Sequence, residues 1–378
     1  MGAVTPRPAA GSLPDERAGG VLVCPETRQP LELIDLEAAE DALAGGDALV
    51  ARSAASGPPP VGPTASVLLR KDGLGAYPIT DGVPVLMLPE VLVSPGASRS
   101  FDLNDPRWAE AYEEMAHYNG RSVTPGQRDR LFGRIEPVMT GPARETFPVP
   151  LDAWIDNVYD GGSQEDAYRY LQPLEGQLVL QIGGTAIHAI KFLLAGAAEA
   201  WHATPMLSEA LLSLRLAEAA GVADRFHAVL AVGEQLPFAD GSFGRIYSGG
   251  SIHHTTTEQS FPEIRRVLEP GGRFAAVEPW RAPLYGVGIR VFGKRERNVH
   301  CRPMTAERVA PLYSTFPVAA VMHHGTFTRY PLLALAKAHM ALPRSAVRAV
   351  LRADDRICSA SSWLRAKGSS VALLAQSP

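Results

Sequence analysis

The residues best suited to chemistry lie in one stretch, 178–280, and the first of them form a glycine turn. A short apolar run at 178–182 ends in Gly-Gly-Thr at 183–185, and an apolar segment of helical length follows at 186–194. This order predicts a strand, a tight turn and a helix. Glycines let the backbone approach a ligand closely, and a helix N-terminus offers N–H groups. The turn is therefore the expected ligand site.

Titratable side chains follow further along the same stretch. The loop GEQLPFADGSF at 233–243 contributes Glu234, and the segment SIHH at 251–254 ends in His253 and His254. A histidine at a strand end suits proton transfer near neutral pH, so His254 is the candidate catalytic base. The alternative, in which His254 only closes the strand end through hydrogen bonds, is equally consistent with the sequence.

The elements that must position these groups alternate regularly. Apolar runs predict strands at 178–182, 199–203, 226–232, 244–248 and 273–277, with helices between them, and strands at 318–323 and 371–376 would complete the sheet. Such βα alternation requires a parallel sheet with right-handed crossovers. The predicted fold class is α/β, with a doubly wound, mostly parallel, seven-stranded Rossmann-like sheet, a small N-terminal β module and a helical lid segment.

Residues 176–279 resemble a known family. The motifs EQLPFADGSF, SIHH and EIRRVLEPGGRFAAVEP are similar to those of class I S-adenosylmethionine-dependent methyltransferases, particularly the small-molecule type with an LPF loop. The resemblance implies S-adenosyl-L-methionine as cofactor and a small-molecule acceptor such as a secondary metabolite or a quinone-like compound. The residues that it assigns to cofactor binding are Gln181, Gly183, Gly184, Thr185, Thr204, Glu234 and Leu236.

Three positions depart from the pattern of the family. Where the family has acids near the first turn, at the end of the second strand and after the third, this sequence has Gln181, Thr204 and Val232. An ionised acceptor contributes about 1.5–3 kcal/mol against about 0.5–1.5 kcal/mol for a neutral one, so cofactor binding is expected to be about two to four decades weaker. A second hypothesis stays open: a methyltransferase-like protein that has lost methyl transfer and serves as a binding or accessory subunit.

Paired potential ligands raise the question of a metal ion. Three adjacent pairs occur near predicted strand ends: His253-His254, His300-Cys301 and His323-His324. Adjacent residues on a strand point to opposite faces, so each pair would offer one inward ligand. We therefore predict no metal site.

The N-terminal part predicts a leader and a small module. Residues 1–19, rich in Pro, Ala and Gly, are expected to be disordered. Residues 20–97, with the run YPITDGVPVL, resemble the zinc-ribbon module of the tRNA-methyltransferase activator family, interrupted by a flexible insertion at 44–63. Thr27 and Arg70 stand where ligands are needed beside Cys24, so the module is expected to lack zinc. We favour a module packed on the main domain over one that docks a partner.

Residues 98–174 are predicted to form a helical lid or linker, and residues 175–378 the methyltransferase-like domain. Aromatic residues recur at helical spacing in the lid segment and either cover the pocket or, as we favour, pack against the core; they include Trp108, Tyr112, Trp154 and Tyr159. In the helical run at 330–367, an i, i+4 stripe of cations marks either a solvated face or a binding face: Arg344, Arg348, Arg352 and Arg356.

The composition of the chain argues against some classes of binding partner. The chain has 378 residues with 36 basic and 40 acidic side chains, and its net charge of −4 argues against a nucleic-acid partner. Its three cysteines are far apart, which favours neither a disulfide framework nor a cysteine-built metal site. No apolar run has the length of a membrane helix, so we expect no membrane partner and a cytoplasmic protein. The sequence leaves the oligomeric state unknown.

Overall fold

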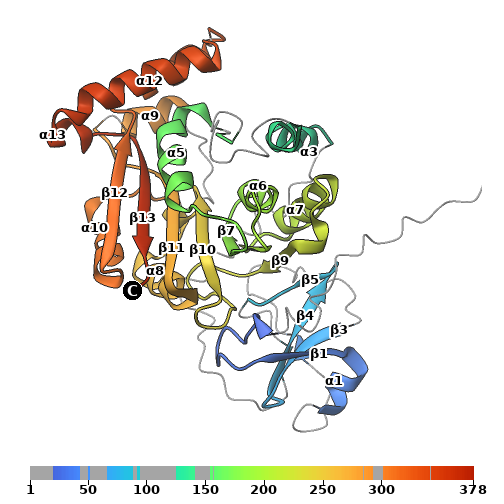
Figure 1. Ribbon diagram of the computed structural model, residues 1–378. Coiled ribbons are helices and arrows are strands. Elements are labelled where there is room, and N and C mark those ends of the chain that lie inside the picture. Colours follow the sequence, from blue (N-terminus) through green and yellow to red (C-terminus); the bar gives the residue numbers. More distant parts are fainter. Residues whose placement is uncertain are drawn as a thin grey trace, which may run out of the picture.

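A computed structural model describes residues 20–42, 50–51, 66–87, 92–93, 125–140, 154–155, 157–283, 285–292, 301–340 and 342–378. The predicted leader, most of the predicted insertion and the aromatic residues Trp108 and Tyr112 lie outside these ranges. Figure 1 shows a small β module beside an α/β domain, with a group of helices at the far end of that domain.

One sheet organises the α/β domain, in the order β12-β13-β11-β10-β7-β8-β9. β13 runs antiparallel to both of its neighbours, and the pairs from β11 to β9 are parallel. This confirms the predicted seven-stranded, mostly parallel sheet. Its strands are β7 (Leu178–Ile182), β8 (Glu199–Thr204), β9 (Phe226–Leu230), β10 (Phe243–Gly249), β11 (Leu268–Pro279), β12 (Val318–His324) and β13 (Ser370–Gln376).

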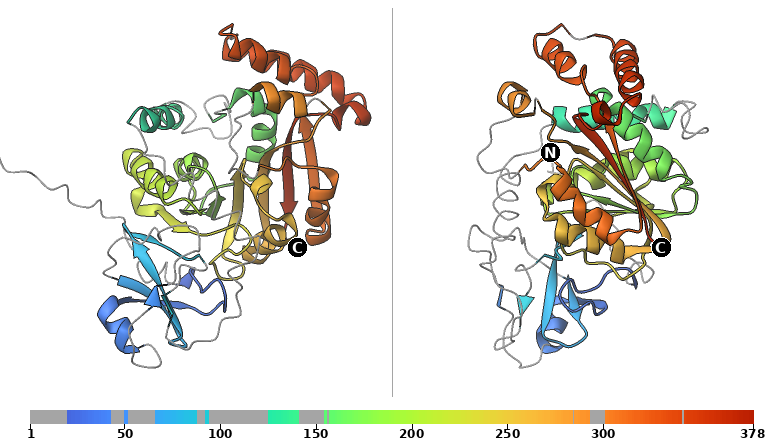
Figure 2. Two further views of the ribbon diagram at one scale, coloured as in Figure 1. Left: turned by 180° about the vertical axis from the view of Figure 1, so that it is seen from behind. Right: turned by 90° about the vertical axis from the view of Figure 1, so that its left-hand side faces the viewer.

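Helices cover both faces of this sheet, as Figure 2 shows in its edge-on view. One face carries α5 (Gly161–Tyr170), α6 (Ile187–Leu194) and α7 (Leu207–Ala219). The other carries α8 (Thr257–Val267) and α10 (Ala306–Thr315). Apolar residues at helical spacing bury one side of each helix against the strands. The alternation of strands and helices along the chain therefore gives a sheet with helices on both faces.

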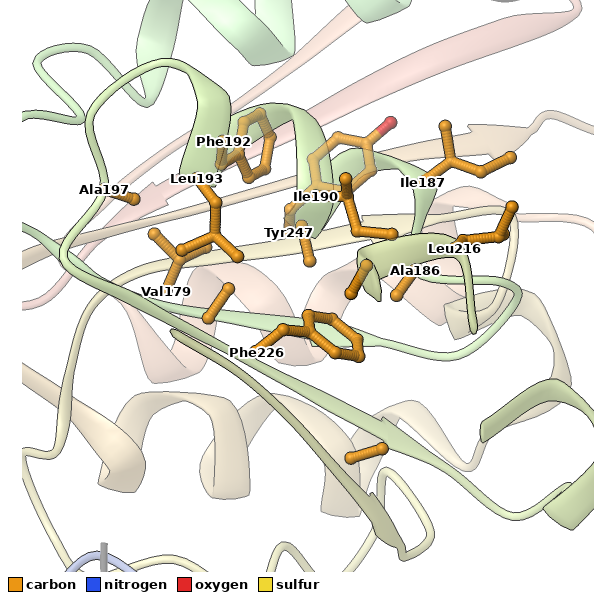
Figure 3. Close-up of a cluster of buried hydrophobic side chains, with 14 of the residues drawn as sticks. Val179, Ala186, Ile187, Ile190, Phe192, Leu193, Ala197, Leu216, Phe226 and Tyr247 are labelled. Atoms are coloured by element: carbon orange, nitrogen blue, oxygen red, sulfur yellow. The ribbon is translucent and has the colours of Figure 1, made fainter. Parts of the chain in front are cut away.

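The core under α6 and α7 holds the glycine turn in place. Ile190 of α6, Leu216 of α7 and Phe226 of β9 are fully or almost fully buried in this cluster, and Figure 3 shows them around the strands. Tyr247 of β10 lies edge-on to Phe192 at 5.6 Å between ring centroids. Burying side chains of this size contributes roughly 1.5–3 kcal/mol each. The strand ends that carry the turn therefore rest on a rigid base.

The N-terminal module is a small antiparallel sheet in the order β1-β3-β4-β6-β2, with β5 paired to β4. Its elements are β1 (Leu31–Asp35), α1 (Leu36–Ala42), β2 (Val50–Ala51), β3 (Ser66–Arg70), β4 (Gly75–Thr80), β5 (Val83–Pro84) and β6 (Leu92–Val93). It contacts the α/β domain through backbone hydrogen bonds: Val23 N donates to Pro237 O at 3.0 Å, and Leu86 N to Leu230 O at 2.9 Å. The module thus packs on the end of β9 and on the loop that follows it.

Polar contacts occupy the region of the module where the resembling family has zinc. The buried Cys24 thiol lies 3.2 Å from the Tyr77 hydroxyl. Arg70 donates to Glu26 at 3.1 Å and to Asp72 at 2.6 Å. Because the Arg70 guanidinium interacts electrostatically with the Cys24 thiol, a cation bound at the thiol would meet an existing positive charge. That the module folds without zinc stays a prediction.

The segment before β7 packs partly into the core. Trp154 and Ile155 are buried, and Tyr168 of α5 is fully buried beside Phe192. Their burial supports the interpretation that Trp154 and Tyr168 pack against the core. The remaining elements of the segment are α3 (Pro125–Phe132), α4 (Glu136–Thr140) and η4 (Val158–Asp160).

The helical run before β13 forms three helices, which extend beyond the sheet in Figure 1. They are α11 (Arg329–Lys337), α12 (Arg344–Ser359) and α13 (Ser362–Arg365), and α9 (Tyr285–Phe292) packs on α11. Two arginines of the predicted stripe are tied to the domain: Arg344 donates to Ile155 O at 2.7 Å and Arg352 to Glu165 at 3.2 Å. None of the helices in the described ranges has the length and apolarity needed to cross a bilayer.

Candidate functional site

A pocket of about 210 Å³ opens at the carboxyl ends of β7, β8, β9 and β10. This is the edge where open parallel sheets bind ligands. The residues that line it and bear on its chemistry are Gly183, Gly184, Thr204, Glu209, Val232, Glu234, Ser251, His254 and Thr255.

The glycine turn forms one wall of the pocket, and its conformation requires glycine. Gly183 has φ +71° and Gly184 φ +61°, both in the left-handed region that residues with a side chain rarely adopt. A Cβ at Gly183 would also lie 2.3 Å from the Ser251 hydroxyl oxygen. The turn therefore has no space for a side chain where it meets the loop after β10.

Gln181 supports the turn from behind. Its side-chain amide donates to Gly183 O at 3.1 Å and to Thr185 O at 3.0 Å, while its oxygen accepts from Ala189 N of α6 at 2.9 Å. A carboxylate in this place could accept from Ala189 but could not donate to two carbonyls. The replacement of an acid by glutamine thus serves the local backbone, and Gln181 does not line the pocket.

His202 supports the same turn from the neighbouring strand β8. Its Nε2 lies 2.7 Å from Gly184 O, and since a carbonyl only accepts, Nε2 carries the proton. Burial lowers the pKa of His202 to about 4. The ring is therefore neutral, and its contribution to the site is structural.

The second strand ends at a threonine whose partner is an acid. Thr204 is buried, and its hydroxyl donates to Glu209 Oε2 at 3.1 Å. Glu209 stands in the first turn of α7 and lines the pocket. The end of β8 thus lacks a carboxylate, but Glu209, five residues later in the chain, supplies one to the same wall of the pocket.

The far wall comes from the loop after β9. Glu234 accepts from Thr256 N at 2.8 Å, just before α8 begins. An anion at a helix N-terminus is stabilised by the N–H groups there, which fixes the Glu234 side chain. Leu236 is fully buried in the core, where its N–H donates to Glu263 at 3.0 Å.

A buried carboxylate organises the segment after β10. Glu278 of β11 accepts from Ser251 N at 3.1 Å, Ile252 N at 2.9 Å and His253 Nδ1 at 2.6 Å. Burial alone would lower the pKa of His253, but hydrogen bonds to Cys301 and Glu278 raise it to about 9. This ion pair fixes η6 (Ile252–His254) and with it the His254 ring, which lines the pocket.

The expectation that adjacent histidines must point apart does not hold at this site. His253 and His254 lie on a 3-10 helix rather than on a strand, and their ring centroids are 4.1 Å apart. Cys301 joins them, so that one potential ligand atom from each of the three residues lies within 4.8 Å of the others. Burial alone would raise the pKa of the Cys301 thiol, but its hydrogen bonds to His253 and Tyr285 lower it.

The structure brings together five of the predicted site residues and leaves three aside. Gly183, Gly184, Thr204, Glu234 and His254 line the pocket. Gln181, Thr185 and Leu236 do not. The sequence reasoning missed Glu209, for which the available signal was an acid in the first turn of the helix after the second strand.

A known protein family matches the segment that contributes much of the pocket. Residues 203–276 match the family described as "Methyltransferase domain", and this segment contains Thr204, Glu209, Glu234 and His254. The match supports the methyltransferase resemblance for this segment of the chain.

Two curated relatives are "Ubiquinone/menaquinone biosynthesis C-methyltransferase UbiE" proteins. The one from Roseobacter denitrificans is 37% identical over 171 residues, which are 44% of this chain and 65% of the relative. The one from Paracoccus denitrificans is 36% identical over 118 residues, 30% of this chain and 47% of the relative. The chain thus spans about half to two thirds of the length of these relatives.

One of the solved structures that the comparison found is geranyl diphosphate C-methyltransferase from Streptomyces coelicolor. It is 16% identical with a TM-score of 0.45, and the alignment covers 71% of this chain and 98% of that one.

Proposed function

We propose that the protein transfers a methyl group from S-adenosyl-L-methionine to a small-molecule acceptor, a secondary metabolite or a quinone-like compound. The matched methyltransferase domain supports the reaction class. Relatives that bear the name of ubiquinone/menaquinone C-methyltransferases support an acceptor of the quinone type.

The observation that carries this proposal is the carboxylate of Glu209 in the pocket wall. The family uses an acid at the end of the second strand to accept hydrogen bonds from the ribose hydroxyls, and Thr204 leaves that place neutral. Glu209 accepts from Thr204 at 3.1 Å and lines the pocket beside it. Because a carboxylate has about four acceptor positions, it can bond the threonine and a ribose hydroxyl together. Glu209 therefore takes the ribose-binding role.

Gly183 and Gly184 leave room for contacts between the cofactor and the backbone of the turn, and in this proposal the acceptor binds near His254. In methyl transfer the protein mainly aligns the nucleophile, the methyl carbon and the sulfur. An acceptor that must lose a proton needs a base, and His254 is the pocket residue suited to that task.

The test is calorimetric titration of the whole chain with S-adenosylhomocysteine. Glu209→Gln should weaken binding by about 10-fold to 100-fold, because a charged acceptor contributes about 1.5–3 kcal/mol. Glu218→Gln is the matched control, since Glu218 lies on the same helix but is exposed. It should leave the affinity unchanged.

Substitution of Thr204 sharpens the same test. An acid at this position would restore the family pattern, but it would face Glu209 at hydrogen-bonding distance. Repulsion between the two carboxylates should make Thr204→Asp bind the ligand more weakly than wild type. If the folded wild-type protein fails to bind S-adenosylhomocysteine at millimolar concentration, the methyltransferase proposal is wrong and the accessory-subunit hypothesis replaces it.

A further inference from the structure

We infer that His253, His254 and Cys301 form a binding site for a thiophilic divalent metal ion, of which Zn²⁺ is the representative. One ligand atom from each residue lies within 4.8 Å of the others. Bonds of about 2.0–2.3 Å in a tetrahedral site put ligand atoms about 3.3–3.8 Å apart, so small side-chain rotations close the site. A thiolate with two imidazoles selects zinc and similar ions over magnesium or calcium.

The surroundings of His253 match those of a histidine that binds a metal. Its Nδ1 donates to Glu278 at 2.6 Å, which leaves Nε2 as the nitrogen that faces the cluster. Metal-bound histidines almost always donate their second ring N–H to a carboxylate or a carbonyl, which fixes the ring and strengthens the ligand. Glu278 has 1% exposure, so this support is rigid.

Hydrogen bonds of Arg308 hold the segment of Cys301 against the histidines. Arg308 of α10 donates to Arg302 O at 2.8 Å, to His253 O at 3.3 Å and to Thr255 O at 2.7 Å. The backbone N–H of Arg302 also donates to His253 O at 3.1 Å. The residue after Cys301 is thus bonded directly to the histidine segment, which keeps the thiol beside the rings.

The charges also balance. A divalent ion bound by the Cys301 thiolate, with the Glu278 carboxylate behind His253, gives a locally neutral assembly, which suits a site that is buried at His253 and exposed at Cys301. Among the three ligands, His254 also lines the pocket, so the ion would lie next to the acceptor end of that pocket. An open coordination position there would bind an acceptor oxygen or sulfur, and a coordinated His254 would no longer serve as base.

This site goes beyond the proposed methyl transfer, and its test does not depend on that reaction. The whole chain, purified under reducing conditions, is titrated with Co²⁺ as a coloured substitute for Zn²⁺. We expect a thiolate-to-cobalt charge-transfer band that Zn²⁺ removes by competition. Cys301→Ser should abolish the band, and His254→Ala should weaken metal binding at least tenfold.

Matched controls separate this site from the rest of the chain. Cys24→Ala should leave cobalt binding unchanged, which also tests the expectation that the N-terminal module lacks zinc. His339→Ala, at an exposed histidine, should likewise have no effect. Circular dichroism checks that each variant is folded. Wild-type protein that gives no thiolate band, or a band that survives in Cys301→Ser, would overturn the inference, leaving Cys301 as a hydrogen-bonded thiol.

Discussion

The two histidine pairs of the α/β domain have similar sequences and opposite geometries. On the 3-10 helix after β10, the rings of His253 and His254 lie 4.1 Å apart. On β12, the side chains of His323 and His324 leave the strand in different directions. The His323 ring lies edge-on to Trp280, with 4.6 Å between the ring centroids. The His324 ring forms hydrogen bonds with Asp166 of α5 and Asp355 of α12. The local backbone thus decides whether neighbouring histidines can act together.

Each pair nevertheless contains one histidine held by carboxylates. Glu278 binds His253, and Asp166 and Asp355 bind His324 at 2.9 and 2.8 Å. The first arrangement supports a wall of the pocket, whereas the second joins three elements at the end of the domain. We expect the first to matter for both stability and ligands, and the second for stability alone.

The largest effect is expected for Glu278→Gln. The change leaves the buried His253 without its carboxylate partner and weakens the bonds to Ser251 N and Ile252 N. Breaking a buried ion pair costs about 3–5 kcal/mol, and urea denaturation should show a loss of this size in the free energy of unfolding. Asp355→Asn is the comparison: His324 keeps Asp166, so the loss should stay below about 2 kcal/mol. Equal losses in the two variants would contradict the distinction between the pairs.

An intermediate, pH-dependent effect is expected for His324→Gln. Burial alone would lower the pKa of His324, but hydrogen bonds to Asp166 and Asp355, the charged groups that face it, raise it to about 9. With an unfolded value of about 6.5, its contribution to stability is complete below that pH and disappears as the pH rises through 9. The variant should therefore lose about 2–3 kcal/mol at pH 6 and much less near pH 10.

Denaturation of both proteins at several pH values measures this difference. His324 is mostly buried, with 17% side-chain exposure, so solvent screens the contacts only in part. A difference between wild type and His324→Gln that stays constant from pH 6 to pH 10 would show that the ring is not held as a cation.

The smallest effect is expected for His323→Phe. Burial is the main cause that lowers the pKa of His323 to about 4, so the ring is neutral and packs against Trp280. Phenylalanine preserves the edge-on aromatic contact, and the free energy of unfolding should change by less than about 1 kcal/mol at every pH. A larger or pH-dependent loss would show that the hydrogen bond between the His323 ring and the Gly368 backbone contributes to stability.

Most of the main sheet could be predicted from the sequence, because each strand is a short apolar run bounded by turn residues. The seven predicted strands match β7 to β13 within two residues, except that β11 begins at Leu268, five residues before the predicted start. The long run at 330–367 is predicted as helical, and the structure divides it into α11, α12 and α13. The break between α11 and α12 contains His339, whose φ is +58°, and Pro343, which directly precedes α12. Asp354 of α12 accepts from Phe327 N and Thr328 N and so ties α12 to the segment before α11.

The site could be located but not fully assigned. Glycine turns and strand ends have local signals, so Gly183, Gly184 and His254 were found. Gln181 is predicted to bind the cofactor, but its side chain bonds the backbone of the turn and does not line the pocket, because a single residue type does not show to which side of the turn its side chain points. Glu209 and the His253–Cys301 contact were missed because they depend on the approach of segments that sequence spacing does not define.

The place of β13 in the sheet has a consequence for how the chain folds. β12 pairs only with β13 among the described strands, and β13 lies between β12 and β11 although it comes last in sequence. During synthesis the parallel strands that carry the pocket can associate first, while β12 waits without a partner. Until β13 is inserted, β11 presents an open edge, and such edges favour pairing with other chains. A newly made chain therefore exposes the edges of both β11 and β12 to mispairing until β13 is in place.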